Sequence, residues 1–72
     1  MTPRAPRVTA ADVLRVLQAH GFRVVRQRGS HCILRNDENR RVTVPMHAGK
    51  TLHPKVLASI ARDVELSPAD FE

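Results

Sequence analysis

Three short extended segments occupy residues 22–45, FRVVRQRGSHCILRNDENRRVTVP, and this stretch decides the fold. The strands we expect are Phe22–Arg28, His31–Arg35 and Arg40–Val44. Gly29-Ser30 and the polar run Asn36–Asn39 have the residue types of tight turns, and Pro45 is expected to end the third strand. Strands this closely spaced pair with their neighbours in sequence, so an antiparallel meander is predicted.

A helix is predicted on each side of these strands. Before them, Thr9 and Asp12 have the spacing of a capping box, and Gly21 can end the helix in a left-handed turn. After them, Pro54 fits a first helical position and His53 is expected to cap the helix. Apolar residues recur at helical spacing in both segments: Val13, Leu14 and Leu17, then Val56, Leu57, Ile60, Ala61 and Val64.

The predicted fold is therefore α+β, with the order α-β-β-β-α. Two helices on one face of a three-stranded antiparallel sheet is the simplest packing of these elements, and the order is that of the double-stranded-RNA-binding domain. Residues 1–8 are expected to form a flexible basic tail, and residues 9–72 a single domain. Phe71 is expected to fold back onto the core.

Composition points to a polyanionic partner. Lys and Arg number 12 against 7 Asp and Glu, which gives a net charge of +5 in 72 residues. Phe22 and Phe71 are the only aromatic residues, so we expect RNA contacts to the backbone and to shape instead of to stacked bases. The single cysteine, Cys32, and the absence of an apolar N-terminal run or membrane-length segment favour a cytoplasmic protein.

No metal cofactor is expected. His31 and Cys32 are adjacent on a strand, so their side chains point to opposite faces and cannot bind one ion. The other histidines lack the spacing of zinc ligands. Alternation along the same strand puts Ile33 and Arg35 on the face of His31. If that face is open, Ile33 is exposed, while Cys32 and Leu34 belong to the core.

Three stretches carry a resemblance to a known family: LQAHGF at 17–22, RQRGSH at 26–31 and VTVPMH at 42–47. Over about Ala10 to Phe71 the sequence resembles the HicA (YcfA-like) toxins. The resemblance implies a toxin of a type II toxin–antitoxin system that cleaves mRNA and forms a hetero-oligomer with a HicB-like antitoxin. It places the family's catalytic histidine at His31. Family members often have Gly-Thr in place of Lys55-Val56, and glycine in place of Glu65.

The chemistry expected of such an enzyme fits the residues around His31. Histidine titrates near neutral pH and can take the proton of a ribose 2′-hydroxyl. The residues expected to hold RNA are Ser30, Arg26, Arg28 and Lys50, and His47 is a candidate second acid or base. Each polar residue also has a purely structural alternative: His31 capping its hairpin, Ser30 bonding nearby backbone, and His47 shaping its loop. The rival function is a non-catalytic double-stranded-RNA-binding module.

Overall fold

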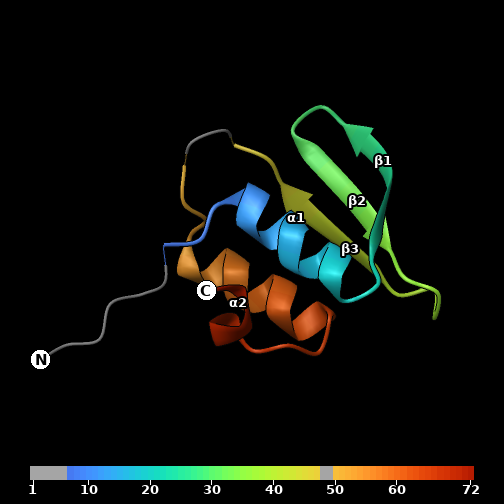
Figure 1. Cartoon of the computed structure of the whole chain (residues 1–72). Coiled ribbons are helices and arrows are strands. Elements are labelled where there is room, and N and C mark those ends of the chain that lie inside the picture. The colour runs from blue at the N-terminus through green and yellow to red at the C-terminus, as the bar shows by residue number, and fades with distance from the viewer. Residues whose placement is uncertain (1–6, 48–49) are drawn as a thin grey trace, which may run out of the picture.

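The computed structural model describes residues 7–47 and 50–72 of the chain. Its elements are α1 (Ala10–Ala19), β1 (Arg23–Arg28), β2 (His31–Arg35), β3 (Arg41–Pro45), α2 (Pro54–Asp63) and the short 3-10 helix η1 (Pro68–Phe71) (Figure 1). The strands lie in the order β1-β2-β3, and both pairs are antiparallel. The predicted α-β-β-β-α order and the meander are confirmed.

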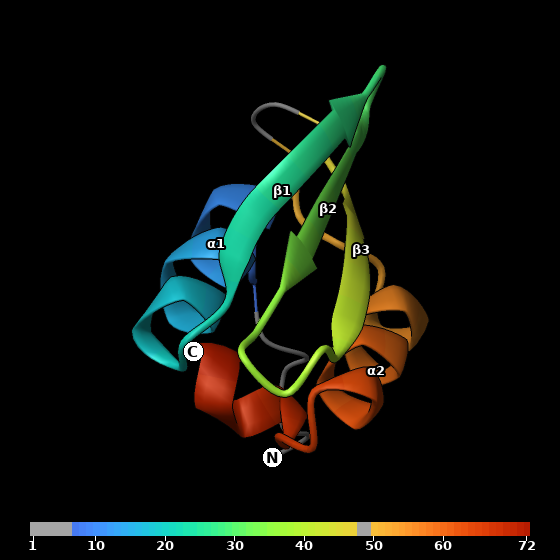
Figure 2. The same ribbon diagram turned by 90° about the vertical axis from the view of Figure 1, so that its right-hand side faces the viewer.

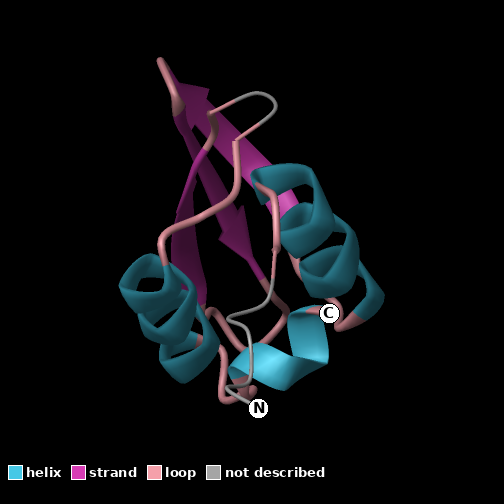
Figure 3. Cartoon of the chain, turned by 90° about the vertical axis from the view of Figure 1, so that its left-hand side faces the viewer, coloured by secondary structure: helices cyan, strands magenta, loops and turns pink. Residues whose placement is uncertain are grey.

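Both α-helices cover one face of the sheet, and the other face is open. Figure 3 shows the molecule from the helix side, and Figure 2 shows it from the opposite side, where the strands lie in front. The core between the helices and the sheet is built mainly from Val13, Leu17, Phe22, Cys32, Leu34, Val42, Val44, Leu57, Ile60 and Phe71. The sheet is thus buried on one side only, as its alternating apolar residues predict.

Val8 belongs to the domain, because its side chain is buried. Its carbonyl accepts a hydrogen bond from the Leu52 N–H at 2.7 Å, and the next residue, Thr9, forms a β-bridge with Thr51. The sequence places Val8 in the expected tail, whereas the structure includes it in the domain because this apolar side chain packs against the core. Arg7 is exposed, and residues 1–6 of that tail lie outside the described residues.

The start of each α-helix has the predicted cap. The Thr9 N–H donates to the Asp12 carboxylate at 3.0 Å, and the Asp12 N–H donates to the Thr9 hydroxyl at 3.2 Å, which completes the capping box of α1. At α2, Nδ1 of His53 accepts a hydrogen bond from the Lys55 N–H at 3.1 Å. Both caps satisfy backbone N–H groups that have no partner inside the helix.

The two α-helices end in the same hydrogen-bonding pattern, a Schellman motif. After α1, the Phe22 N–H donates to the Leu17 carbonyl at 3.0 Å, and Gly21 has a φ of +88°. After α2, the Leu66 N–H donates to a carbonyl of the last turn at 2.8 Å, and Glu65 has a φ of +60°. Glycine adopts this conformation freely, while a residue with a side chain pays about 1–2 kcal/mol.

Arg40 supports the strained end of α2. Its guanidinium donates to the Asp63 carbonyl at 2.9 Å and to the Glu65 carboxylate at 3.2 Å. A cation at the carboxyl end of a helix also meets the negative end of the helix dipole. We expected Arg40 to begin the third strand, but β3 begins one residue later, at Arg41. The reason is that the Arg40 side chain turns towards the end of α2 and away from the open face of the sheet.

Pro45 is part of β3, where the sequence predicts the strand to stop before it. It pairs with His31, and the following Met46 N–H donates to the Ser30 carbonyl at 2.5 Å. Since partners in an antiparallel ladder alternate between hydrogen-bonded and non-bonded pairs, the nitrogen of Pro45 faces the outer edge of the sheet. A proline is tolerated there because no ladder hydrogen bond is lost.

The capping box predicts a pH dependence of stability. Hydrogen bonds from the Thr9 backbone N–H first, then from the Thr9 hydroxyl and from Arg15, hold the pKa of the Asp12 carboxyl below its usual 3.8. A lowered pKa stabilises the fold above pH 3.8, and the gain disappears as the pH falls through the folded-state value. Asp12→Asn should therefore lower the melting temperature at pH 7 and have little effect near pH 2.

Thermal unfolding followed by circular dichroism across this pH range measures the effect. Glu38→Gln is the control, because Glu38 is exposed and its carboxylate makes no hydrogen bond among the described residues. A pH-independent loss in Asp12→Asn would contradict the assignment.

Candidate nucleic-acid interface

The central strand β2 separates the core from the open face of the sheet. Cys32 and Leu34 are buried against the helices. His31, Ile33 and Arg35 alternate with them and therefore lie on the open face, as predicted. The first residue of β2 on the open face is therefore an exposed histidine.

A bulge in β1 brings two further arginines to this face. Val24 pairs with Leu34, but Arg26 pairs with Ile33, so Val25 is an extra residue in the ladder. In a regular strand, Arg26 and Arg28 would share the face of Val24, which is the helix side. The extra residue reverses the alternation, and Arg28 consequently pairs with His31 on the open face. No feature of the sequence that we recognised predicts this bulge.

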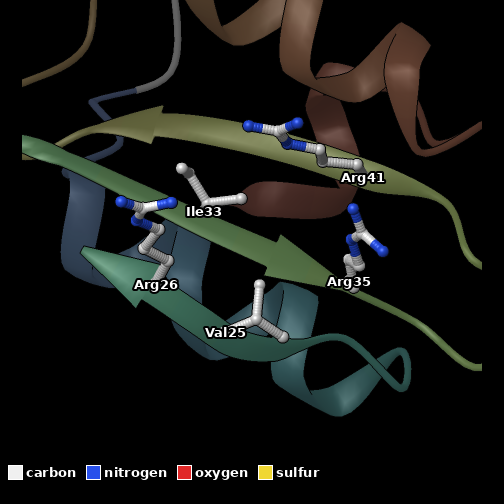
Figure 4. Close-up of a pocket in the computed structure, with 5 residues that line it drawn as sticks. All are labelled: Val25, Arg26, Ile33, Arg35 and Arg41. Atoms are coloured by element: carbon white, nitrogen blue, oxygen red, sulfur yellow. The ribbon is translucent and has the colours of Figure 1, made fainter. Parts of the chain in front are cut away.

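Ile33 is buried on the open face, where the sequence predicts it to be exposed. It is 7% exposed, yet it does not belong to the core cluster. Its neighbours are Val25, Arg26, Arg35 and Arg41, which stand around it in Figure 4. The expectation was wrong: Ile33 lies in the central strand between Arg26 and Thr43, and long arginine side chains can lay their aliphatic stems over apolar surface while they keep their charged ends in water.

The open face is strongly basic. Its arginines are Arg23, Arg26, Arg28, Arg35 and Arg41. Arg23 forms an ion pair with Asp37 at 2.8 Å, and Arg35 donates to the Asn39 side chain at 3.0 Å. Arg26, Arg28 and Arg41 have no carboxylate partner among residues 7–47 and 50–72. Their charge is therefore available to an anionic ligand.

His31 and Ser30 lie at the tip of the β1–β2 hairpin. Gly29 has a φ of +55° and Ser30 completes the two-residue turn between Arg28 and His31. Both Ser30 and His31 are exposed, and neither side chain makes a hydrogen bond within the described part of the chain. The structural alternatives, a histidine that caps the hairpin and a hydroxyl bonded to nearby backbone, have no hydrogen bond to support them.

His47 and Lys50 lie in the segment that follows β3. The Lys50 N–H donates to the His47 carbonyl at 3.2 Å, and both residues are exposed. The bond between Met46 and Ser30 keeps the start of this segment beside the hairpin turn. His47 thus lies two residues beyond Pro45, the ladder partner of His31. Between His47 and Lys50 are two residues that lie outside the described ranges.

Cys32 has no part in the open face. Its side chain is buried in the core, and burial raises the pKa of its thiol, so it stays protonated and unreactive. Among the described residues, no group of three His, Cys, Asp or Glu side chains is arranged to hold a metal ion.

Comparison with known proteins supports the fold. A family model described as the HicA toxin of bacterial toxin–antitoxin systems matches residues 10–66. The chain belongs to this family. The match covers α1, the whole sheet and α2, and it ends at the Schellman motif of Leu66. A search among curated proteins finds no match.

Membership of the HicA toxin family implies an antitoxin partner. The glycine that HicA toxins often have where Glu65 stands is explained by the positive φ at this position, which glycine adopts without strain. In this HicA toxin the ion pair with Arg40 partly offsets that cost. None of the helices in the described ranges is both long enough and apolar enough to span a membrane.

Proposed function

We propose that this HicA toxin is a metal-independent endoribonuclease that cleaves mRNA in the cytosol, with His31 as its catalytic residue. The observation that carries the proposal is the pairing of an exposed His31 with Arg28 at the edge of a face that holds five arginines. Such a face attracts a polyanion, and its histidine has the proton-transfer chemistry that RNA cleavage needs.

The reaction that these residues support is transfer within the RNA strand. His31 takes the proton of a ribose 2′-hydroxyl, and the 2′-oxygen attacks the adjacent phosphorus. The bond to the 5′-oxygen of the next nucleotide breaks, which leaves a 2′,3′-cyclic phosphate and a free 5′-hydroxyl once a proton is supplied. Arg28, opposite His31, stabilises the charge that builds up on the phosphate oxygens.

Other residues have supporting roles in this proposal. Arg26, Ser30 and Lys50 hold phosphates on either side of the cleaved bond. His47 is the candidate donor of the proton to the leaving 5′-oxygen, since the chain brings it back towards the hairpin turn. Among the described residues, the other two histidines are bonded at helix ends, His20 to the Val16 carbonyl and His53 to the Lys55 N–H.

The rival function, a non-catalytic binder of double-stranded RNA, has less support. Such a domain contacts two successive minor grooves and commonly needs a basic second helix. Here α2 carries Lys55 and Arg62, but Asp63 ends it and Glu65 lies two residues further on. Five arginines lie instead on the side of the sheet that faces away from both helices. This distribution favours RNA binding by the sheet.

A HicB-like antitoxin is the partner we propose, in a hetero-oligomeric complex that covers the open face. An acidic surface is drawn to the arginines rapidly and blocks access to His31 by occlusion. Binding only to the folded toxin also stabilises it, which matters for a domain of this size with a thin core.

Replacing His31 tests the catalytic assignment. His31→Ala should lower the rate of RNA cleavage by at least about 100-fold, because the general base is lost. The fold should persist, since His31 is exposed. His20→Ala is the matched control, as it removes an exposed histidine at the end of α1. Cleavage of a labelled RNA, with and without EDTA, is the measurement.

Full activity in folded His31→Ala would refute the mechanism. Loss of wild-type activity in EDTA with recovery in magnesium would refute metal independence.

The basic face predicts a strong effect of salt on RNA affinity. If a few phosphates are neutralised, log Kd should rise with log salt concentration with a slope of roughly 2–5. Arg28→Gln should reduce this slope by about one, because one phosphate contact is lost. Fluorescence anisotropy with a non-cleavable 2′-O-methyl RNA measures both quantities. A flat salt dependence would contradict binding through phosphates.

The complex with the antitoxin should protect His31. We expect carbethoxylation of His31 by diethylpyrocarbonate to be suppressed in the complex, while His20 on the helix side continues to react. The complex should also melt at a higher temperature than the free toxin. An unprotected His31, or RNA cleavage that persists at saturating antitoxin, would contradict occlusion.

A further inference from the structure

A pocket lies on the open face between the bulge of β1 and the start of β3. Its volume is about 300 Å³, and its lining residues are Val25, Arg26, Ile33, Arg35 and Arg41. In Figure 4 Ile33 stands among three arginines that come from all three strands, and Val25 lies beside them on β1. Apolar side chains and positive charge thus line the same pocket.

The apolar part of this pocket distinguishes it from a simple phosphate patch. Val25 is 47% exposed, and Ile33, though largely covered, lines the pocket with three arginines and lies outside the core cluster. An isolated phosphate gains nothing from aliphatic surface, whereas the flat face of a nucleobase does. The plane of a guanidinium group can also stack on a base. In this chain, arginine can therefore take the stacking role that aromatic side chains have in other RNA-binding proteins.

The charges around the pocket also indicate an anionic ligand. Arg35 and Arg41 occupy paired positions on β2 and β3, an arrangement that repels when no anion lies between. Arg35 has only the neutral Asn39 amide as partner, and Arg26 and Arg41 have no carboxylate partner in the described ranges. The carboxylate of Asp37 is already paired with Arg23. A bound phosphate relieves this repulsion.

The pocket is adjacent to His31 along the same strand. Ile33 lies two residues from His31 on the same face, which is about 7 Å along β2. Arg26 similarly lies two residues from Arg28, the partner of His31. An RNA strand whose cleaved bond lies at His31 therefore meets the pocket at a neighbouring nucleotide.

We propose that this pocket binds one unpaired nucleotide of single-stranded RNA next to the cleaved bond. Its base lies against the exposed Val25, above the largely covered Ile33, and its phosphate lies among Arg26, Arg35 and Arg41. Paired bases in a duplex are stacked and cannot enter, so the pocket selects single-stranded substrate. The inference rests on the proposed function, because the cleaved bond is placed at His31, whereas binding of the base itself requires only that RNA lies on the open face.

The test uses binding to a short single-stranded 2′-O-methyl RNA in which one nucleotide at a time is made abasic. For the wild type, we expect one position at which loss of the base weakens binding about tenfold. Ile33→Ser should remove that dependence, while Ile33→Val should retain it. Ile33 lies outside the core cluster, so Ile33→Ser should fold, which thermal unfolding verifies.

The arginine contribution is tested with a matched pair of variants. Arg41→Gln should weaken binding to the intact RNA at least about fivefold more than Arg15→Gln, which removes an equal charge from the exposed surface of α1. Equal losses in both variants, or RNA binding with no abasic position that matters, would overturn the pocket while leaving the RNA-cleaving function intact.

Two other outcomes also overturn the proposal. If Ile33→Ser weakens binding to the antitoxin and leaves RNA binding unchanged, the pocket belongs to the protein interface. If the wild type neither binds nor cleaves RNA, both the pocket assignment and the proposed function are refuted.

Discussion

The structure depends on the burial of one face of β2. Cys32 and Leu34 are buried in a core cluster that includes residues of both helices, and their partners Val44 and Val42 belong to the same cluster. A register slip of one residue would bury His31 and expose these apolar side chains, a change that costs more than a domain of this size can tolerate. The same constraint that builds the core therefore fixes the histidine on the open face.

The bulge at Val25 adds two arginines to the open face and so makes it more basic. Without the extra residue, Arg26 and Arg28 would point to the helix side, and the open face would lose two cations beside His31. Bulges near edge strands commonly redirect side chains for function. Here the redirected arginines lie beside β2, which carries Ile33 and Arg35, so that arginines and aliphatic side chains line the same pocket.

Periodicity and turn residues predicted much of this fold. The capping box of Thr9 and Asp12, the left-handed Gly21 and the His53 cap depend on local sequence, so they could be recognised directly. The bulge, the turn of Arg40 towards α2 and the covering of Ile33 depend on contacts between distant segments, which local patterns do not encode. Family resemblance, and not periodicity, singled out His31.

The central claim is that RNA binds on the sheet face away from the helices. Nuclear magnetic resonance of the ¹⁵N-labelled protein, titrated with a single-stranded 2′-O-methyl RNA, tests it most directly. We predict that the amide shifts concentrate on β1, β2 and the Gly29-Ser30 turn, with smaller changes over α1 and α2. Shifts confined to the two helices, the binding surface of a double-stranded-RNA module, would contradict the account.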